Sequence, residues 1–342
     1  MQIIYTDDNR GVRIEFSEEY SSEFVYFAEN IVWGNEGLKF CMKGLAIDFR
    51  NFSKPYFISM YVNNRLTVIS IINHKRLMID LKETDVFYSC LWGTDLSQTS
   101  QGWCTLMIDE VTNHLFETYP NALIYAYIEK NNVSAKRVVQ KTGFRSFADF
   151  KVASAVRFVP SPNKHCRLLS PAKRNSMIKL LDELHKTRTL NDVKFTFDES
   201  CYYVYEENNV IKAGFQVKKM RWSIVSMDGM RGHLLLKIFT KIPLLCTFFD
   251  PTEFSYLCIG NIYFTDINSF NKLMNAVMHH YNIKTCIAYG LADSSTDSQF
   301  IKCMSHGLLS SADASADMYI KSNNVSLSSL GRFPFISICD SI

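Results

Sequence analysis

Runs and alternations of hydrophobic residues predict strands and helices that occur twice along the chain. Apolar runs at residues 56–62 and 66–72 flank the turn 63–65 and predict a hairpin. A further strand at 86–92 leads into a polar loop, and apolar residues at helical spacing then predict a helix from Gly102 to about Thr118, with Leu106, Ile108, Val111 and Leu115 facing inward.

The same pattern predicts the elements on either side of this unit. Within residues 17–50 a helical stripe is formed by Phe24, Phe27, Ala28, Ile31 and Val32. After Pro120 a buried strand at 122–128 is followed by a short helix, which opens at Asn132 and closes at Gly143. Residues 150–158 then supply one more strand.

The second part of the sequence repeats this order. After a linker at 160–163, a helix begins at Ser170-Pro171, and a hairpin spans 202–205 and 210–217. Its Asn208-Asn209 turn lies 145 positions after Asn63-Asn64, and a shift of 164 positions places Gly307 on Gly143. The pattern indicates duplication, with an extra apolar segment at 230–253 and two domains, 1–160 and 161–342.

Composition narrows the choice of function. The 342 residues are 47% hydrophobic and 13% aromatic, which allows a core in each half. Because Lys and Arg total 37 against 34 acidic residues, the net charge of +3 is too small to favour nucleic acid as a partner. No signal or membrane-spanning stretch is evident, and ten cysteines without C-x-x-C spacing favour reduced thiols in a cytoplasmic protein without a metal site.

Two segments resemble the coenzyme A site of the GNAT acyltransferases, the GCN5-related N-acetyltransferases. One is the strand at 122–128 with the helix Asn132-x-x-Ala135 and the closing Gly143-Phe144. The other reads Thr99-x-x-Gly102-x-Cys104, where the family signature is Q/R-x-x-G-x-G/A, so only the central glycine is kept outright. The resemblance implies an α/β fold with a mixed sheet and two GNAT-like domains, of which the second is degenerate.

The resemblance also implies where acetyl-CoA or coenzyme A would bind. A helix N-terminus with small residues before it offers free backbone amides and a positive dipole end to the pyrophosphate. The strand that ends at Thr94 should part from the strand at 122–127, and its free backbone should pair with the pantetheine amide. The implied cofactor residues are Trp92, Thr94, Thr99, Ser100, Gln101, Gly102, Trp103, Cys104, Thr105, Asn132 and Ser134. Charged residues on the following helix flank the nucleotide or simply face solvent: Lys136, Arg137 and Lys141.

Catalytic residues are harder to identify, because Val139 stands where many members of the family have a tyrosine acid. Tyr88 and Tyr127 are candidate proton donors, with Tyr125 as a further one, although packing in the sheet also explains them. Asp95 is the candidate base, ahead of Glu83 and Asp85. Cys90 and Cys104 have no neighbouring base and are expected to be inert.

The second half lacks a glycine-bearing loop, since only residues 265–268 separate its strand from its helix. We expect it to shape the acceptor pocket, with Tyr263, Asp266 and Asp293 as possible contacts, although packing or capping also explains them. The favoured function is acetyl or acyl transfer from acyl-CoA to a small-molecule or peptide amine by direct transfer in a ternary complex. The protein would be a monomer with pseudo-dimeric domains or a homodimer, without nucleic acid or membrane partners. A CoA-binding regulatory module and an aminoacyl-tRNA-using transferase are the alternatives.

Overall fold

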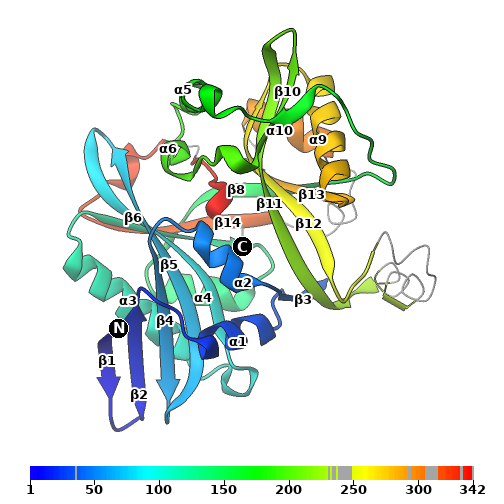
Figure 1. Cartoon of the computed structure of the whole chain (residues 1–342). Coiled ribbons are helices and arrows are strands. Elements are labelled where there is room, and N and C mark those ends of the chain that lie inside the picture. Colours follow the sequence, from blue (N-terminus) through cyan, green and yellow to red (C-terminus); the bar gives the residue numbers. More distant parts are fainter. Residues whose placement is uncertain are drawn as a thin grey trace.

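A mixed sheet runs through the computed structural model of the chain, and helices pack on its faces (Figure 1). The structure describes residues 1–34, 37–229, 232, 236–237, 249–291, 294–304, 315–331 and 334–340. The strands are β1 (Gln2–Asp7), β2 (Val12–Ser17), β3 (Leu38–Met42), β4 (Pro55–Val62), β5 (Arg65–Ile79), β6 (Lys82–Thr94), β7 (Ala122–Glu129), β8 (Arg145–Val156), β9 (Cys166–Leu168), β10 (Tyr202–Glu207), β11 (Val210–Met227), β12 (Phe254–Phe264), β13 (Thr285–Leu291) and β14 (Ser315–Asn323). The helices are α1 (Ser22–Asn30), α2 (Leu45–Asp48), α3 (Trp103–Thr118), α4 (Val133–Lys141), α5 (Arg174–Leu184), α6 (Val193–Thr196), α9 (Ile267–Tyr281) and α10 (Ser295–Met304).

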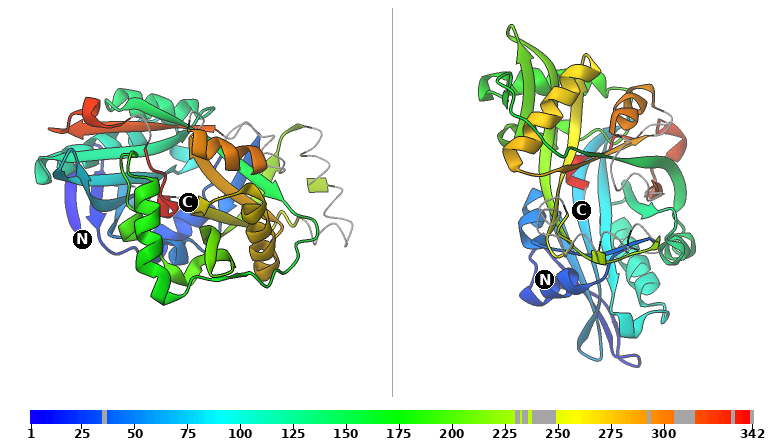
Figure 2. Two further views of the ribbon diagram at one scale, coloured as in Figure 1. Left: turned by 90° about the horizontal axis from the view of Figure 1, so that it is seen from above. Right: turned by 90° about the vertical axis from the view of Figure 1, so that its right-hand side faces the viewer.

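The two halves of the chain exchange strands within this sheet. The order is β1-β2-β4-β5-β6-β7-β14-β8-β13-β12-β11-β10-β9, and β3 pairs with β11 off this path. β14 belongs to the second half of the sequence but lies between β7 and β8, and β8 of the first half pairs with β13. Figure 2 shows β14, in orange-red, running beside the teal strands of the first half. The two halves therefore share the central strands of the sheet. The domain boundary at residue 160 stays a prediction.

The predicted repeat is present in the structure. Both hairpin turns place two asparagines in the left-handed region, with φ of 50° and 61° at Asn63 and Asn64 and 50° and 63° at Asn208 and Asn209. Each half then has a bulged antiparallel strand, a helix, a strand parallel to the bulged one and a second helix. Even the bulge recurs: Leu91 in β6 has φ of 52°, and its counterpart Asn261 in β12 has φ of 50°.

Several boundaries differ from the predictions. The chain begins with the hairpin β1–β2, which the sequence reading did not assign, and α1 ends at Asn30, before the last members of the predicted stripe. β8 begins at Arg145 instead of residue 150, and β5 continues to Ile79 instead of residue 72. The extension of β5 begins with three buried polar residues, Asn73, His74 and Lys75, so the apolar run that predicted the strand ends before the strand does. Gly307 and most of the segment 230–253 lie outside the described residues.

Hydrophobic clusters on both faces of the sheet hold the first half in shape. On one face α3 buries Met107, Ile108, Val111 and Leu115, so Met107 and not Leu106 completes its fully buried side. On the other face α1 buries Phe24 and Ala28, and the cluster there includes residues of β13 and β14. Because this packing fixes α3, its N-terminus is held close to the end of β6.

Candidate functional site

The sheet parts between β6 and β7, as the resemblance implied. The two strands pair in parallel only from Asp85 opposite Ala122 to Tyr88 opposite Tyr125, although β6 continues to Thr94. Beyond Tyr88, β6 pairs only with β5, whereas β7 pairs along its length with β14. The bulge at Leu91 lies in the part of β6 that pairs with β5 but not with β7. This part of β6 therefore offers one edge of backbone groups that no strand of the described part occupies.

The loop between β6 and α3 presents a row of unbonded amides at the same place. Among the described residues, none accepts a hydrogen bond from the backbone amides of residues 99–105. Ser100 and Gly102 have φ of 67° and 81°, and alternation of left-handed residues in a loop creates concave amide nests that suit anions. A Cβ at Gly102 would meet no atom within 4 Å, so the space in front of the helix N-terminus is open. The 16 residues of α3 add a positive dipole end.

The second half has no such loop. β12 ends at Phe264 and α9 begins at Ile267, so the connection is too short to form a cradle. The side chain of Asp266 caps α9 by accepting from the amide of Ser269 at 2.8 Å, and Tyr263 packs against the cluster around Tyr202. Asp293 lies outside the described residues. Among the candidates for acceptor contacts, Asp266 is thus engaged as a helix cap.

A cavity of about 450 Å³ begins at the parted strands and reaches the second half. From the first half it is lined by residues of β6, β7 and the start of α4, which include Tyr88, Cys90, Trp92, Tyr127 and Asn132. Opposite these lie mainly apolar and aromatic residues, together with one carboxylate: Trp33, Phe40, Phe150, Trp222, Ile287, Tyr289, Ile336 and Asp340. The structure therefore brings Tyr88 and Tyr127 together with Trp92 and Asn132, and adds residues that no pattern in the sequence connects.

The two candidate tyrosines differ in their hydrogen bonds. The Tyr88 hydroxyl donates to the backbone oxygen of Asp340 at 2.8 Å. The Tyr127 hydroxyl is buried and lies near the Asp340 carboxylate, but it makes no hydrogen bond of normal geometry within the described residues. Burial raises the pKa of both phenols well above the ordinary value, so both are neutral donors at neutral pH. Val139 is fully buried on the opposite face, among the residues of α3, so α4 supplies no hydroxyl from this position.

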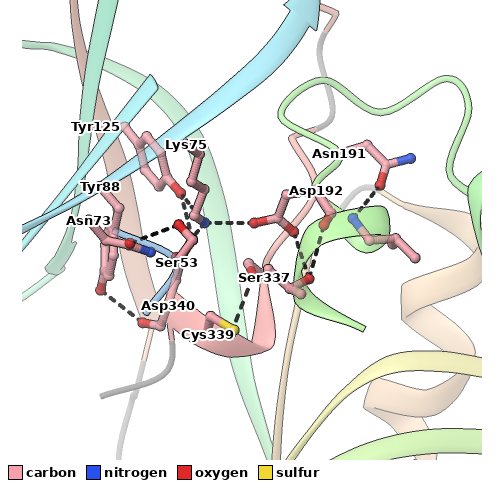
Figure 3. Close-up of polar contacts among 12 residues, drawn as sticks. Ser53, Asn73, Lys75, Tyr88, Tyr125, Asn191, Asp192, Ser337, Cys339 and Asp340 are labelled. Atoms are coloured by element: carbon pink, nitrogen blue, oxygen red, sulfur yellow. Dashed lines mark hydrogen bonds and ion pairs between the residues drawn. The ribbon is translucent and has the colours of Figure 1, made fainter. Parts of the chain in front are cut away.

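Behind the tyrosines lies a buried cluster of charges from three distant segments (Figure 3). The Lys75 ammonium on β5 lies 2.7 Å from carboxylate oxygens of both Asp192 and Asp340, and all three side chains are 2% exposed or less. Tyr125 donates to the second oxygen of Asp340 at 2.6 Å. Burial alone would lower the pKa of Lys75, but the two carboxylates together raise it, so the ammonium is held charged. Burial raises the pKa of Asp340, against the attraction of Lys75.

Two further predicted site residues, Asp95 and Asn132, lie in the loops that follow β6 and β7. Asp95 is not placed as a catalytic base would be, because it does not line the cavity. Its carboxylate pairs with Arg65 at 2.5 Å and accepts a hydrogen bond from the Ser97 amide. These hydrogen bonds from Ser97 lower the pKa of Asp95. Asn132 caps α4 by accepting from the Ala135 amide at 2.9 Å.

Other members of the predicted set have structural contacts. Trp92 donates to Ser89 at 2.7 Å, the Thr99 hydroxyl donates to the backbone oxygen of Leu96, and Trp103 lies under the Arg10 guanidinium at 4.6 Å. Burial raises the pKa of Cys104 to about 12, and Cys104 thus stays a thiol at neutral pH. Outside the loop, Ser134 is exposed on α4 and Thr94 is the last residue of β6.

The basic residues of α4 do not form one group. Lys136 pairs with Asp317 of β14 at 2.8 Å, whereas Arg137 and Lys141 are exposed on α4. Within the described ranges, no set of His, Cys, Asp or Glu side chains is arranged to hold a metal ion. None of the described helices has the length and apolar character needed to cross a membrane.

Comparison with known proteins supports the fold. No family model and no curated protein matches the sequence. Among solved structures, N-myristoyltransferase of Saccharomyces cerevisiae with bound myristoyl-CoA and inhibitors is similar over 96% of this chain and 80% of its own, at 10% identity and a TM-score of 0.50. A GCN5-related N-acetyltransferase from Anabaena variabilis covers 92% of this chain and 74% of its own, at 9% identity and 0.48. A probable N-acyltransferase from Enterococcus faecalis covers the same shares at 8% and 0.49.

At these identities the likeness concerns the fold alone, and it is the yeast structure that carries it. The resemblance implied a mixed sheet with two GNAT-like halves, and that match confirms this fold. The chain therefore has the tandem fold of the GNAT-like acyltransferases.

Proposed function

We propose that the protein is an acyl-CoA-dependent N-acyltransferase that binds its cofactor in the first half, between β6, β7 and the N-terminus of α3. The main support is that an unpaired strand edge and a row of backbone amides without acceptors lie close together. The edge of β6 beyond Tyr88 is unpaired, and the amides of residues 99–105 have no acceptor in the described part. Pantetheine would pair with the strand edge, and the pyrophosphate would accept from the loop amides.

The transfer itself needs few groups from the protein. The neutral amine nitrogen attacks the thioester carbon, the carbon–sulfur bond breaks, and the proton that the nitrogen loses goes to the departing thiolate. Tyr127 is the preferred donor to the reacting thioester, because it lines the cavity and its hydroxyl, unlike that of Tyr88, makes no hydrogen bond of normal geometry within the described residues. Tyr88 positions the floor of the cavity through its bond to Asp340. Asp95 is the weaker part of the predicted set, since Ser97 and Arg65 occupy its oxygens.

Isothermal titration calorimetry with CoA and acetyl-CoA tests the cofactor site. We expect micromolar binding by the natural chain and a loss of about tenfold or more in Gly102→Leu, because the side chain would fill the open space in front of the amides. Gly229→Leu is the matched control: its φ of 77° imposes the same backbone cost of about 1–2 kcal/mol outside the loop of residues 99–105. Absence of heat and of thermal stabilisation with every acyl-CoA tried would remove the proposal.

A second candidate is a CoA-binding module that has lost catalysis. The observation in its favour is Val139, which is buried in the core at the position where the family supplies a hydroxyl. Binding of CoA without any acyl transfer across a broad panel of amines would select this candidate. Transfer to any of those amines at a rate that Tyr127→Phe reduces would select the enzyme.

A further inference from the structure

Buried ion pairs join the two halves of the chain in both directions. Lys75 on β5 lies 2.7 Å from a carboxylate oxygen of Asp192, the residue before α6 (Figure 3). In the opposite direction, Lys218 on β11 lies 4.0 Å from Asp48, the last residue of α2. All four side chains are 10% exposed or less. Each half therefore contributes one lysine and one aspartate, and each lysine reaches a carboxylate of the other half. These are called the crossed ion pairs below.

The crossed ion pairs follow the internal repeat of the fold. The register shift that marks the bulge falls at Ser70 in β5 and at Phe215 in β11, again 145 positions apart. Lys75 comes five residues after the first of these positions and Lys218 three residues after the second. Because side chains alternate along a strand, the two lysines lie on the same face of equivalent strands. Their partners lie at the short helices α2 and α6, each of which precedes a hairpin.

The order of the strands shows what these contacts require. Among the described strands, six lie between β5 and β11, so a flat sheet with ordinary strand spacing would hold these two strands about 34 Å apart. The contacts between the two halves therefore require a sheet that curls until its arms approach each other. The cavity lies between these arms: Tyr88 and Tyr127 line it from the first half, and Trp222 and Tyr289 line it from the second.

Net stability does not explain why charges are buried between the halves. Desolvation offsets most of the attraction within a buried ion pair, and apolar residues of similar volume stabilise a protein equally well. Displacement of one partner, however, leaves both charges buried and unpaired, which is strongly unfavourable. A buried ion pair therefore favours one arrangement of the elements that carry it. Two pairs at separate points fix both the distance between the halves and their register.

Other charges adjoin each of the crossed ion pairs. Asp340, also from the second half of the sequence, lies 2.7 Å from Lys75 and so strengthens the first link. Near Asp48, Arg221 attracts the carboxylate and Glu29 repels it, and Lys218 has a further interaction partner. The link through Lys218 is consequently the weaker of the two, in agreement with its longer separation of 4.0 Å.

We propose that the crossed ion pairs position the two walls of the cavity for acyl transfer. The inference rests on the proposed function and identifies positioning residues for it: Lys75, Asp192, Lys218 and Asp48. None of the four is among the described residues that line the cavity, so they act through its walls and not on the reacting atoms. The proposed cofactor site lies in the first half alone, whereas both halves line the cavity. Loss of a link should therefore slow acyl transfer and leave CoA binding intact.

Double variants separate positioning from stability. Lys75→Met leaves two buried carboxylates without a cation and should lower the melting temperature by roughly 5–10 °C. Adding Asp192→Asn restores the net charge of the natural cluster, so the double variant should regain most of that loss. It still lacks the link between β5 and the second half, and we expect its acyl transfer in single turnovers to stay slower by about tenfold or more. Its affinity for CoA, measured by calorimetry, should stay within about threefold of the natural value.

The second link and a control pair complete the set of variants. Lys218→Met with Asp48→Asn removes the weaker link, and we expect the same pattern with a slowing of acyl transfer by about 3- to 10-fold. Arg174→Met with Glu199→Gln removes an ion pair of 2.8 Å that lies within the second half. This control should keep the natural rate of transfer, CoA affinity and melting temperature.

Hydrogen exchange followed by mass spectrometry gives a readout that does not depend on acyl transfer. β3 of the first half pairs with β11 of the second from Leu38 opposite Met227 to Met42 opposite Trp222. We expect the backbone amides of β3 to exchange faster, by about tenfold, in both double variants that lack a link than in the natural protein and the control. Recovery of transfer together with stability, or unchanged exchange in β3, would overturn the positioning role. Absence of CoA binding would instead remove the proposed function, and the exchange rates would still decide whether the ion pairs hold the halves in register.

Discussion

The buried lysine makes the most demanding prediction about stability. Lys75→Met removes the cation that lies 2.7 Å from both Asp192 and Asp340, while a side chain of similar length keeps the space filled. The two carboxylates then face each other without compensation. The variant can return to the natural net charge only if one of them binds a proton, and the cost of that proton sets the size of the effect.

The magnitude follows from the ordinary pKa of 3.8 for an aspartic acid. Protonating such a group at pH 7 costs about 4 kcal/mol, at about 1.4 kcal/mol for each pH unit above its pKa. This agrees with the roughly 3–5 kcal/mol found when one partner of a buried ion pair is removed. At pH 5 the same cost falls to about 1.5 kcal/mol.

The sign of the pH dependence is fixed by the direction of the shift. In the variant the folded protein holds the proton more tightly than the unfolded chain, so the folded pKa is raised. Stability is then fully retained below the unfolded pKa near 4 and is lost as the pH rises toward the raised folded value. The natural protein should show a shallower dependence, because Lys75 opposes the rise of the pKa of Asp340.

Urea unfolding at several pH values between 5 and 7.5, followed by tryptophan fluorescence and circular dichroism, measures both quantities. Adding Asp192→Asn to Lys75→Met restores the net charge of the natural cluster. The double variant should therefore recover most of the lost unfolding free energy at pH 7. A loss of unfolding free energy below about 1 kcal/mol at pH 7, or a loss that does not change with pH, would refute an electrostatic origin of the effect.

Two further predictions concern the reactive groups. Tyr127→Phe should lower the rate of acyl transfer, measured in single turnovers, by about 10- to 100-fold and should cost less stability than Tyr88→Phe, because no hydrogen bond of normal geometry is lost. Tyr88→Phe should lower stability by about 1–3 kcal/mol, because it removes the bond to the backbone oxygen of Asp340. The opposite pattern would exchange the roles of the two tyrosines. Burial raises the pKa of Cys104 and Cys339 to about 12, so both should resist iodoacetamide at pH 8, as measured by mass spectrometry. Cys104→Ser should keep acyl transfer. Labelling of either cysteine in the folded protein would contradict this prediction.

Local features of the sequence were sufficient for most of the fold. The hairpins with Asn-Asn turns, the helix that begins at Gly102 and the helix capped by Asn132 depend on residues close together, and the structure has them near the predicted positions. The parting of the strands beyond Tyr88 was predicted from the resemblance to a family and is confirmed. The full length of β5 was missed because buried polar residues interrupt its apolar run. The hairpin β1–β2 was overlooked although β2 alternates apolar and polar residues, which is the usual signal of a half-buried strand.

The charge cluster could not be predicted from the sequence. Lys75 stands between His74 and Arg76, which looks like the charged end of a strand, and its partners follow 117 and 265 positions later. Nothing in the surroundings of Asp340 distinguishes it from an ordinary acidic residue. Only the folding of residues 334–340 into the interior, where Phe335 and Ile338 are buried, places it at the cavity. Asp95 is a candidate base because Glu83, Asp85 and Asp95 bracket the strand that faces substrate in the family, but the structure shows that Ser97 and Arg65 occupy its oxygens.

The position of β14 has a consequence for how the protein is made. β7 leaves the ribosome early, yet the strand that covers its side is not synthesised until residues 315–323. Pairing across so long an interval raises the contact order and slows folding. Until β14 is made, the first half exposes β7 as an edge strand of a hydrophobic sheet, and such an edge can pair with other nascent chains. We therefore expect fragments that stop before residue 315 to aggregate or to depend on chaperones, and the two halves to regain solubility when they are produced together.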